Sequence, residues 1–167
     1  MKSRLIAVGS APNATQDIEK VQRKDNYDFM AIGMDAIEKC PYPISWVATN
    51  HLEDLPTIDR LMHQKGDNVA KIISYHRSPR TDIAIPYEGT SGSSAIIGVL
   101  AGIQMGYEKI VLCGCPLQGN APEGNPYEAF QQGWVEHEKE VRDKVVSVSG
   151  WTKEFLGAPV DFRNCLS

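Results

Sequence analysis

The sequence predicts an α/β protein in which helices pack on both faces of a parallel β-sheet of five or six strands. Three observations carry this prediction. Short apolar runs typical of buried strands alternate with segments of helical periodicity. The 167 residues suffice for one domain with a sizeable core. Apolar residues make up 42% of the chain and charged residues 23%, which is too apolar for a disordered protein.

The first half of the chain contains apolar runs that we interpret as strands, at residues 4–8, 27–32, 44–48 and 69–75. Segments with helical spacing separate them, at residues 14–22, 35–39 and 53–64. In the last of these segments Leu55, Ile58 and Leu61 fall on one helical face. Repeated strand–helix–strand units of this kind place their strands parallel in one sheet.

The second half continues this alternation. A loop rich in Arg, Pro and Thr contains a weaker strand candidate at residues 83–85. Residues 93–105 are apolar nearly all round, which predicts a buried helix ended by Gly106. Residues 109–112 then predict a buried strand of the parallel type.

The character of the chain changes after residue 115, where a loop rich in Pro and Gly begins. One amphipathic helix is predicted next by the stripe Tyr127, Phe130, Trp134, His137 and Val141. Residues 145–148 are a weaker candidate for a last strand, and residues 151–156 predict a last short helix. We therefore expect a three-layer, Rossmann-like core over residues 1–117. A C-terminal loop and helical cap over residues 118–167 would pack on it in a single domain.

Charge and composition narrow the function classes. The chain has 17 Lys and Arg against 21 Asp and Glu, a formal net charge of −4, and its basic residues do not gather. We therefore expect no nucleic-acid partner. No apolar run approaches the roughly 20 residues that a bilayer requires, and the chain does not start with a signal-peptide core. This predicts a cytoplasmic protein without a membrane partner; the sequence indicates no oligomeric state.

The four cysteines are Cys40, Cys113, Cys115 and Cys165, which are too few and too scattered for a disulfide scaffold. The spacing of Cys113 and Cys115 is found in metal sites, but no second Cys or His pair lies nearby at ligand spacing. We interpret these cysteines as reduced structural thiols and expect no metal site.

Two loops carry the strongest signals for binding an anion. The first, Gly9-Ser10-Ala11-Pro12-Asn13, joins a strand to a helix, so its N–H groups can face an anion. Its alternative is an ordinary turn with Asn13 as N-cap. The second, Gly89-Thr90-Ser91-Gly92-Ser93-Ser94, offers hydroxyls and N–H groups at the positive end of the buried helix. Its alternative is a capped helix packed tightly on the sheet.

Neither loop matches a Walker A loop or the GxGxxG dinucleotide motif, which disfavours classical NTPase and NAD sites. Polar residues also follow the other strands, at the edge where parallel sheets bind ligands. As a set they suit recognition of a ribose, a sugar or a base, although each alone suits a surface loop: Asp35, Asn50, His51, His76, Cys115 and Gln118. His137 lies on the apolar stripe, where it is either a packed, hydrogen-bonded histidine or a general base.

Two sequence blocks resemble those of known Rossmann-like families. The blocks are Leu5-Ile6-Ala7-Val8-Gly9-Ser10-Ala11-Pro12-Asn13 and the stretch from Gly89-Thr90-Ser91-Gly92 to Leu112-Cys113-Gly114-Cys115-Pro116-Leu117. They are similar to blocks of the bacterial CMP-sialic-acid-dependent sialyltransferases of glycosyltransferase family 42, and of 6-hydroxymethylpterin diphosphokinase-like proteins. The C-terminal stretch Ser149-Gly150-Trp151-Thr152 looks like small phage or prophage proteins.

The resemblance implies a site for a nucleotide or nucleotide-sugar between the two loops. Asn50 matches a sialyltransferase asparagine that lines the donor site, and Asp35 falls where the pterin-kinase-like proteins carry a strand-end aspartate. The implied nucleotide-binding residues are Gly9, Ser10, Ala11, Pro12, Asn13, Asp35, Asn50, Thr90, Ser91, Gly92 and Ser93. The substrate-binding candidates are His51, His76, Cys115, Gln118 and Tyr127. His137 and Tyr127 are the candidates for the catalytic histidine and a phosphate-binding tyrosine of the sialyltransferases.

Three functions are compatible with these residues. The first is glycosyl transfer from a CMP-sugar without metal or other cofactor, in which loop N–H groups stabilise the leaving phosphate. The acceptor's proton would pass to His137, or alternatively to His51 or His76. The second is non-catalytic binding or sequestering of a nucleotide. The third is Mg²⁺-dependent diphosphate transfer to a pterin-type alcohol, with Asp35 as the Mg²⁺ ligand.

Overall fold

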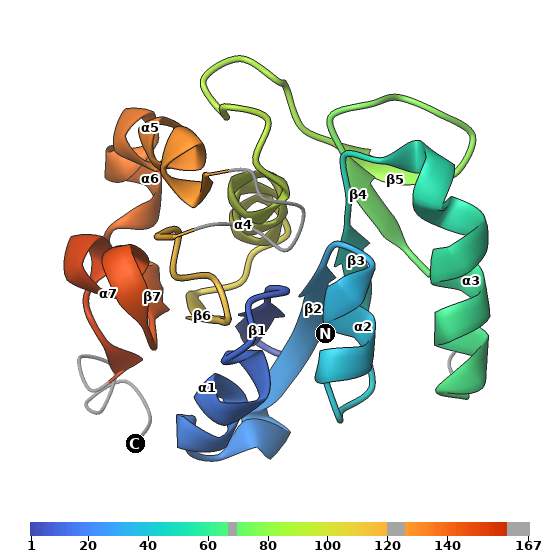
Figure 1. The fold of residues 1–167 in the computed structure, drawn as a ribbon, viewed down its shortest axis with the longest axis horizontal. Helices are drawn as coiled ribbons and strands as arrows, with labels where there is room; N and C mark the ends of the chain where they lie inside the picture. Colours follow the sequence, from blue (N-terminus) through green and yellow to red (C-terminus); the bar gives the residue numbers. More distant parts are fainter. Residues whose placement is uncertain (67–69, 120–125, 160–167) are drawn as a thin grey trace.

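Seven parallel strands form one sheet in the order β5-β4-β3-β2-β1-β6-β7 (Figure 1). The computed structural model describes residues 1–66, 70–119 and 126–159. The strands are β1 (Arg4–Val8), β2 (Tyr27–Ile32), β3 (Trp46–Ala48), β4 (Ile72–Ser74), β5 (Thr81–Ala84), β6 (Lys109–Cys113) and β7 (Val145–Ser147). The predicted α/β class with a parallel sheet is therefore confirmed.

The strand count exceeds the predicted five or six, because both weaker candidates join the sheet. β5 pairs with β4 at one edge and alternates between half-buried and exposed residues, so its apolar signal is short. β7 pairs with β6 at the other edge and contributes three buried residues. Val69, at the start of the predicted fourth strand, lies outside the described residues, as do part of the predicted loop and Cys165.

Helices connect most successive strands. On the way to β4 they are α1 (Ala14–Lys20), the 3-10 helix η1 (Lys24–Asn26), α2 (Asp35–Lys39), the 3-10 helix η2 (Leu52–Asp54) and α3 (Leu55–Gln64). α4 (Ser94–Gln104) leads into β6. The last part contains the 3-10 helix η3 (Tyr127–Phe130), α5 (Gln131–Glu136), α6 (Glu138–Val141) and α7 (Gly150–Leu156).

The helices form one layer on each face of the sheet, which gives the predicted three layers (Figure 1). Strand residues such as Ile6 and Val8 point to the face that α1, α2 and α3 cover. The alternating residues Leu5 and Ala7 point to the other face, where α4 packs together with core residues of α5, α6 and α7. α4 is buried from residue 95 to residue 102, in agreement with its apolar sequence.

The predicted single helix through the stripe of Tyr127 and Val141 is wrong, because the segment is broken into η3, α5 and α6. The backbone leaves helical geometry at His137, where φ is −100° and ψ is 17°. Trp134 and Val141 are nevertheless fully buried in the core. The spacing of apolar residues indicates which face of a segment is buried, but not whether the segment forms one continuous helix.

The order of the strands creates a crevice between β1 and β6. From β1 the chain proceeds through β2, β3, β4 and β5 to one edge, and it returns through α4 to place β6 on the other side of β1. Open parallel sheets bind ligands beyond the carboxyl ends of strands at such a switch point. Within the described ranges, the helices are all too short or too polar to cross a membrane.

Candidate functional site

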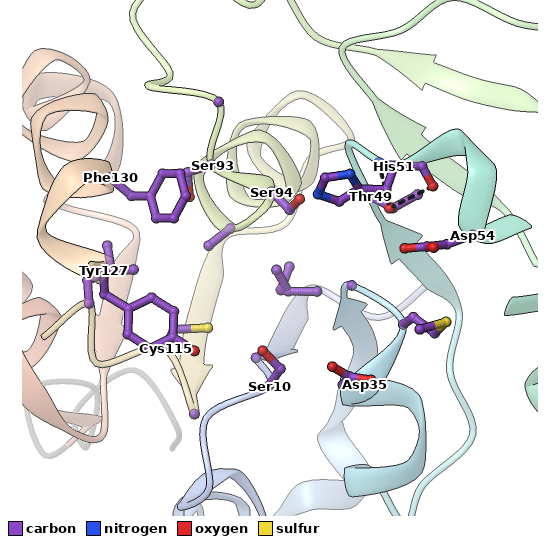
Figure 2. Close-up of a pocket in the computed structure, with 18 of the residues that line it drawn as sticks. Ser10, Asp35, Thr49, His51, Asp54, Ser93, Ser94, Cys115, Tyr127 and Phe130 are labelled. Atoms are coloured by element: carbon purple, nitrogen blue, oxygen red, sulfur yellow. Dashed lines mark hydrogen bonds between the residues drawn. The ribbon is translucent and has the colours of Figure 1, made fainter. Parts of the chain in front are cut away.

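A pocket of about 440 Å³ lies at the carboxyl ends of β1, β2, β3 and β6. Figure 2 shows Ser93 and Ser94 between two chemically different sides, one with Tyr127 and Phe130 and the other with His51 and Asp54. The lining residues are Gly9, Ser10, Ile32, Gly33, Met34, Asp35, Thr49, His51, Glu53, Asp54, Gly92, Ser93, Ser94, Ala95, Gly114, Cys115, Pro116, Leu117, Tyr127 and Phe130. The volume suits a ligand of nucleotide size.

The first turn of α4 enters this pocket. Ser93, Ser94 and Ala95 line it, and Ser93 occupies the N-cap position without making a side-chain cap hydrogen bond. The preceding turn is fixed by buried Thr90, whose Oγ1 donates to the Tyr87 carbonyl oxygen at 2.5 Å. The first N–H groups of a helix have no partner within the helix, so this end presents donors and a partial positive charge to the pocket.

The turns after β1 and β6 form the opposite part of the lining and contact each other closely. Gly9 donates from its backbone N–H to the Cys113 carbonyl oxygen at 2.7 Å. A Cβ atom on Gly9 would lie 2.3 Å from the Gly114 carbonyl oxygen, so only glycine permits this approach. Lys39 donates from its Nζ to the Ser10 carbonyl oxygen, which places an ammonium group beside the first turn.

Carboxylates occupy the side of the pocket near β2 and β3. Asp35 begins α2, while Glu53 and Asp54 belong to η2. His51 Nδ1 lies 3.3 Å from Glu53 Oε1. A hydrogen bond with its own backbone, together with one from His51, lowers the pKa of Glu53. None of the described lining residues is Lys or Arg, so the groups that could face an anion here are N–H groups and hydroxyls.

The other side of the pocket is apolar and aromatic. Tyr127 and Phe130 of η3 line it together with Cys115 (Figure 2). Burial, followed by the nearby Asp17 carboxylate, raises the pKa of Cys115 to about 12. Its thiol therefore stays protonated at neutral pH, which disfavours a role as a nucleophile.

Several predicted site residues lie in the pocket. They are Gly9, Ser10, Asp35, His51, Gly92, Ser93, Cys115 and Tyr127. The others are not among the described lining residues: Ala11, Pro12, Asn13, Asn50, Thr90, Ser91, His76, Gln118 and His137. The two predicted loops therefore each contribute residues to one pocket, but only part of each loop reaches it.

Some of the residues outside the lining support those inside it. Asn50 donates from Nδ2 to the Gly92 carbonyl oxygen, and Asn13 donates from Nδ2 to Ser149 Oγ at 2.9 Å. Asn13 stands at the N-cap position of α1, as the alternative interpretation predicted, but its side chain makes no capping hydrogen bond.

The two other predicted histidines make contacts away from the lining. The His76 ring packs on Tyr75 with ring centroids 4.1 Å apart. His137 Nδ1 lies 2.9 Å from Glu140 Oε1, and its Nε2 is 3.2 Å from where a Cβ atom on Gly89 would lie. His137 thus has a carboxylate partner, and its role as a general base stays a prediction.

Sequence reasoning missed Thr49, Glu53, Asp54 and Phe130 as lining residues, and it included Ser94 only as part of the second predicted loop. Thr49, Glu53 and Asp54 flank the predicted strand-end residues Asn50 and His51. Phe130 belongs to the same apolar stripe as Trp134, and this stripe predicts that both rings lie on the buried face of a helix. No signal in the sequence separates an aromatic ring that lines a pocket from one that fills the core.

No family model matches the chain, and no curated protein matches its sequence. Among solved structures, the chain is similar to the sialyltransferase CstII from Campylobacter jejuni in complex with a substrate analogue, cytidine-5'-monophosphate. The TM-score is 0.62 at 13% sequence identity, and the match covers 95% of this chain and 85% of that chain. The two chains share a fold. A sequence identity of 13% does not show what this chain binds.

Proposed function

We propose that the protein binds a nucleotide or nucleotide-sugar of the CMP type in the pocket and is glycosyltransferase-like. The observation that carries this proposal is the first turn of α4, which enters the pocket at the switch point of the sheet without a side-chain cap. Such a helix end is a site for a phosphate group. Further support comes from the fold shared with a sialyltransferase whose structure contains CMP.

In this proposal the phosphate lies against the N–H groups of Ser94 and Ala95 and the hydroxyl of Ser93. The Gly9–Ser10 turn completes the phosphate site from the β1 side. Lys39 adds a positive charge beside that turn through its contact with the Ser10 carbonyl oxygen. These groups compensate for the lack of Lys and Arg among the described lining residues.

The nucleoside would occupy the two sides of the pocket. Asp35 follows β2, where a carboxylate can accept hydrogen bonds from ribose hydroxyls, as it does in other doubly wound folds. Tyr127 and Phe130 offer ring faces on which a base can stack. The pocket thus provides a donor-rich end for a phosphate and an acceptor-rich side for hydroxyl groups.

The chemistry we propose is transfer of a sugar from the nucleotide to an acceptor hydroxyl. The acceptor oxygen bonds to the anomeric carbon while the bond from that carbon to the phosphate oxygen breaks, and the nucleotide leaves with the electron pair. His51 lines the pocket, and Glu53 can hold its Nδ1–H, which leaves Nε2 to accept the acceptor's proton. His137 is the other candidate base. It lies beside Gly89 and is not among the described lining residues.

A thermal-shift panel tests this function. The purified protein is melted with CMP, CDP, UDP, GDP, AMP, ATP and CMP-sialic acid, each with Mg²⁺ and with EDTA. We expect cytidine nucleotides to raise the melting temperature equally in both conditions. A ligand at about 100 times its Kd adds about 2.7 kcal/mol to the free energy of unfolding, which is easily detected.

The alternatives give different results. A shift that requires both ATP and Mg²⁺ favours diphosphate transfer with Asp35 as a metal ligand. Binding of CMP-sialic acid without its turnover in the presence of sugar acceptors, under conditions where CMP release is measured, favours a sequestering protein. The absence of any shift across the panel contradicts nucleotide binding.

A further inference from the structure

A network of buried polar side chains lies next to the pocket and outside its lining. Asp17 of α1 is 1% exposed, and its Oδ2 accepts a hydrogen bond from the Gly114 backbone N–H at 2.9 Å. The same oxygen accepts one from Ser149 Oγ at 2.7 Å and one from Asn13 Nδ2 at 3.2 Å. One carboxylate oxygen thereby joins α1, the turn after β6 and the turn after β7.

Thr152 of α7 holds the next two residues of the same turn. Its Oγ1 is fully buried, lies 2.7 Å from Ser147 Oγ and donates to the Cys115 carbonyl oxygen at 2.6 Å. Its backbone N–H donates to the Pro116 carbonyl oxygen at 3.3 Å. The three successive residues Gly114, Cys115 and Pro116 are thus each bonded to Asp17 or to Thr152, and all three line the pocket.

The surrounding packing leaves this turn little freedom to move. Gly114 has a φ of +68°, and a Cβ atom on it would lie 2.5 Å from Ala14 Cβ. A Cβ atom on Gly150 would lie 2.3 Å from Pro116 Cβ, so the α7 side is equally tight. The Ala11 N–H donates to the Gly114 carbonyl oxygen at 3.3 Å, which couples the turn to the first loop.

We propose that Asp17, Ser149 and Thr152, which we call the buried clamp, are positioning residues for the nucleotide site. They fix the turn of residues 114–116, and through it the Gly9–Ser10 turn, in the geometry that receives the ligand. This proposal rests on the proposed function, since it assigns residues to that same pocket. It also makes the C-terminal α7, distant in sequence from both anion-binding loops, a required part of the site.

A buried polar group that loses its hydrogen-bond partner destabilises the structure around it. Removing the Thr152 hydroxyl leaves the Cys115 carbonyl oxygen without this donor, and the turn then shifts to recover one. Because Gly9 touches Gly114 without spare space, a shift of one turn moves the other. Ligand affinity should therefore fall although none of the clamp residues touches the ligand.

The test compares CMP affinity by calorimetry in matched variants. Thr152→Val removes the hydroxyl at nearly constant volume and should raise the Kd for CMP about tenfold or more. Thr152→Ser keeps the hydroxyl and should restore a Kd within about threefold of the wild type. The control is Tyr107→Phe, which deletes another buried hydroxyl, bonded at 2.7 Å to Asp28 near the amino-terminal end of β2 and away from the pocket lining. It should lower stability and leave the Kd for CMP unchanged.

A second measurement does not need the ligand. In Asp17→Ala the Gly114 amide should exchange with deuterium at least about tenfold faster, because it loses its acceptor, while the amides of β2 keep their rates. If Thr152→Val is poorly folded, Ser149→Ala is the milder variant, because Ser149 is only half-buried and gives Asp17 one of three donors.

Each outcome decides the proposal. Folded Thr152→Val and Ser149→Ala proteins that bind CMP as tightly as the wild type would overturn it, and so would an unchanged Gly114 exchange rate in Asp17→Ala. If the wild type binds no nucleotide, the proposed function fails by itself. Faster Gly114 exchange would then still show that Asp17 holds the turn, and an unchanged rate would refute the clamp as well.

Discussion

Asn50 donates a hydrogen bond from its Nδ2 to the carbonyl oxygen of Gly92, and this bond ties the end of β3 to the turn that opens α4. Asn50 is buried, and its Oδ1 has no hydrogen-bond partner within the described part of the chain. A buried acceptor without a partner is costly in free energy. The nitrogen of this amide bears on the site through Gly92, which lines the pocket.

Asn50→Asp should abolish CMP binding. A carboxylate has no N–H to donate to the Gly92 carbonyl oxygen, and it adds a negative charge beside the proposed phosphate position. Loss of the buried hydrogen bond should also cost about 1–3 kcal/mol in the free energy of unfolding. Calorimetry with CMP and chemical denaturation measure the two effects. A variant that binds CMP like the wild type would place the ligand away from this turn.

Gly9→Ala should be strongly destabilising. The added Cβ would lie 2.3 Å from the Gly114 carbonyl oxygen and 2.5 Å from Cys115 Sγ, so backbone must move. We expect a loss of about 1–3 kcal/mol in the free energy of unfolding, as for an overpacked core. Urea denaturation measures it. An unchanged unfolding midpoint would mean that the β1 and β6 turns are not packed as described.

Gly92→Ala should behave differently, because its added Cβ would meet only the Tyr87 ring, at 3.6 Å. Its φ of +70° costs about 1 kcal/mol for an alanine. The free energy of unfolding should fall by that amount. The free energy of CMP binding should weaken by a larger amount, because Gly92 lines the pocket. The larger Gly92→Val should abolish binding. Unaltered affinity in Gly92→Val would remove this turn from the site.

Stability should decrease in alkaline solution through Cys115. Its thiol titrates at a pKa of about 12 in the folded protein against 9.0 for an unperturbed thiol. Between these values the unfolded state loses a proton that the folded state keeps, so the free energy of unfolding falls as pH rises. The slope for this group is about 1.4 kcal/mol per pH unit. Cys115→Ser should lose less stability than the wild type between about pH 9 and 10.

Phe130→Ala should weaken CMP binding if a base stacks on this ring. Base–aromatic stacking contributes about 1–3 kcal/mol, so the Kd should rise about 5- to 150-fold. Val135→Ala on α5 is the matched control, because Val135 is 43% exposed and is not among the described lining residues. Equal affinities of Phe130→Ala and the wild type would exclude stacking on this side of the pocket.

The fold could be predicted largely because buried parallel strands have continuous apolar sequences, as in β1 and β6. β5 carries a weaker signal because one edge strand of four residues buries few side chains. The sequence does not predict the break at His137. Trp134 and Val141 lie on either side of this break, at a spacing that also fits one continuous helix. The periodicity of apolar residues indicates which side chains are buried. The local backbone geometry depends on contacts that this periodicity does not show.

The site could be predicted at the level of loops and not of side chains. Parallel strands all end on the same side of a sheet, so the turns after β1 and before α4 were both expected on that side. Which residues of these turns face the pocket depends on partners far away in sequence. Asn13 is turned toward Ser149, and Thr90 toward the Tyr87 carbonyl oxygen. Asp17, the buried acceptor of the clamp, follows the first loop and has no signature that marks it.

An NMR titration of ¹⁵N-labelled protein with CMP, with inorganic phosphate as the reference ligand, tests directly whether a nucleotide binds at the first turn of α4. The backbone amides of Ser94, Ala95 and Ser10 should shift most, in the presence of EDTA as well as Mg²⁺. Phosphate alone should shift the α4 amides and leave residues near Asp35 and Phe130 unchanged. Shifts confined to another surface, or none at millimolar CMP, would contradict a nucleotide site at the first turn of α4.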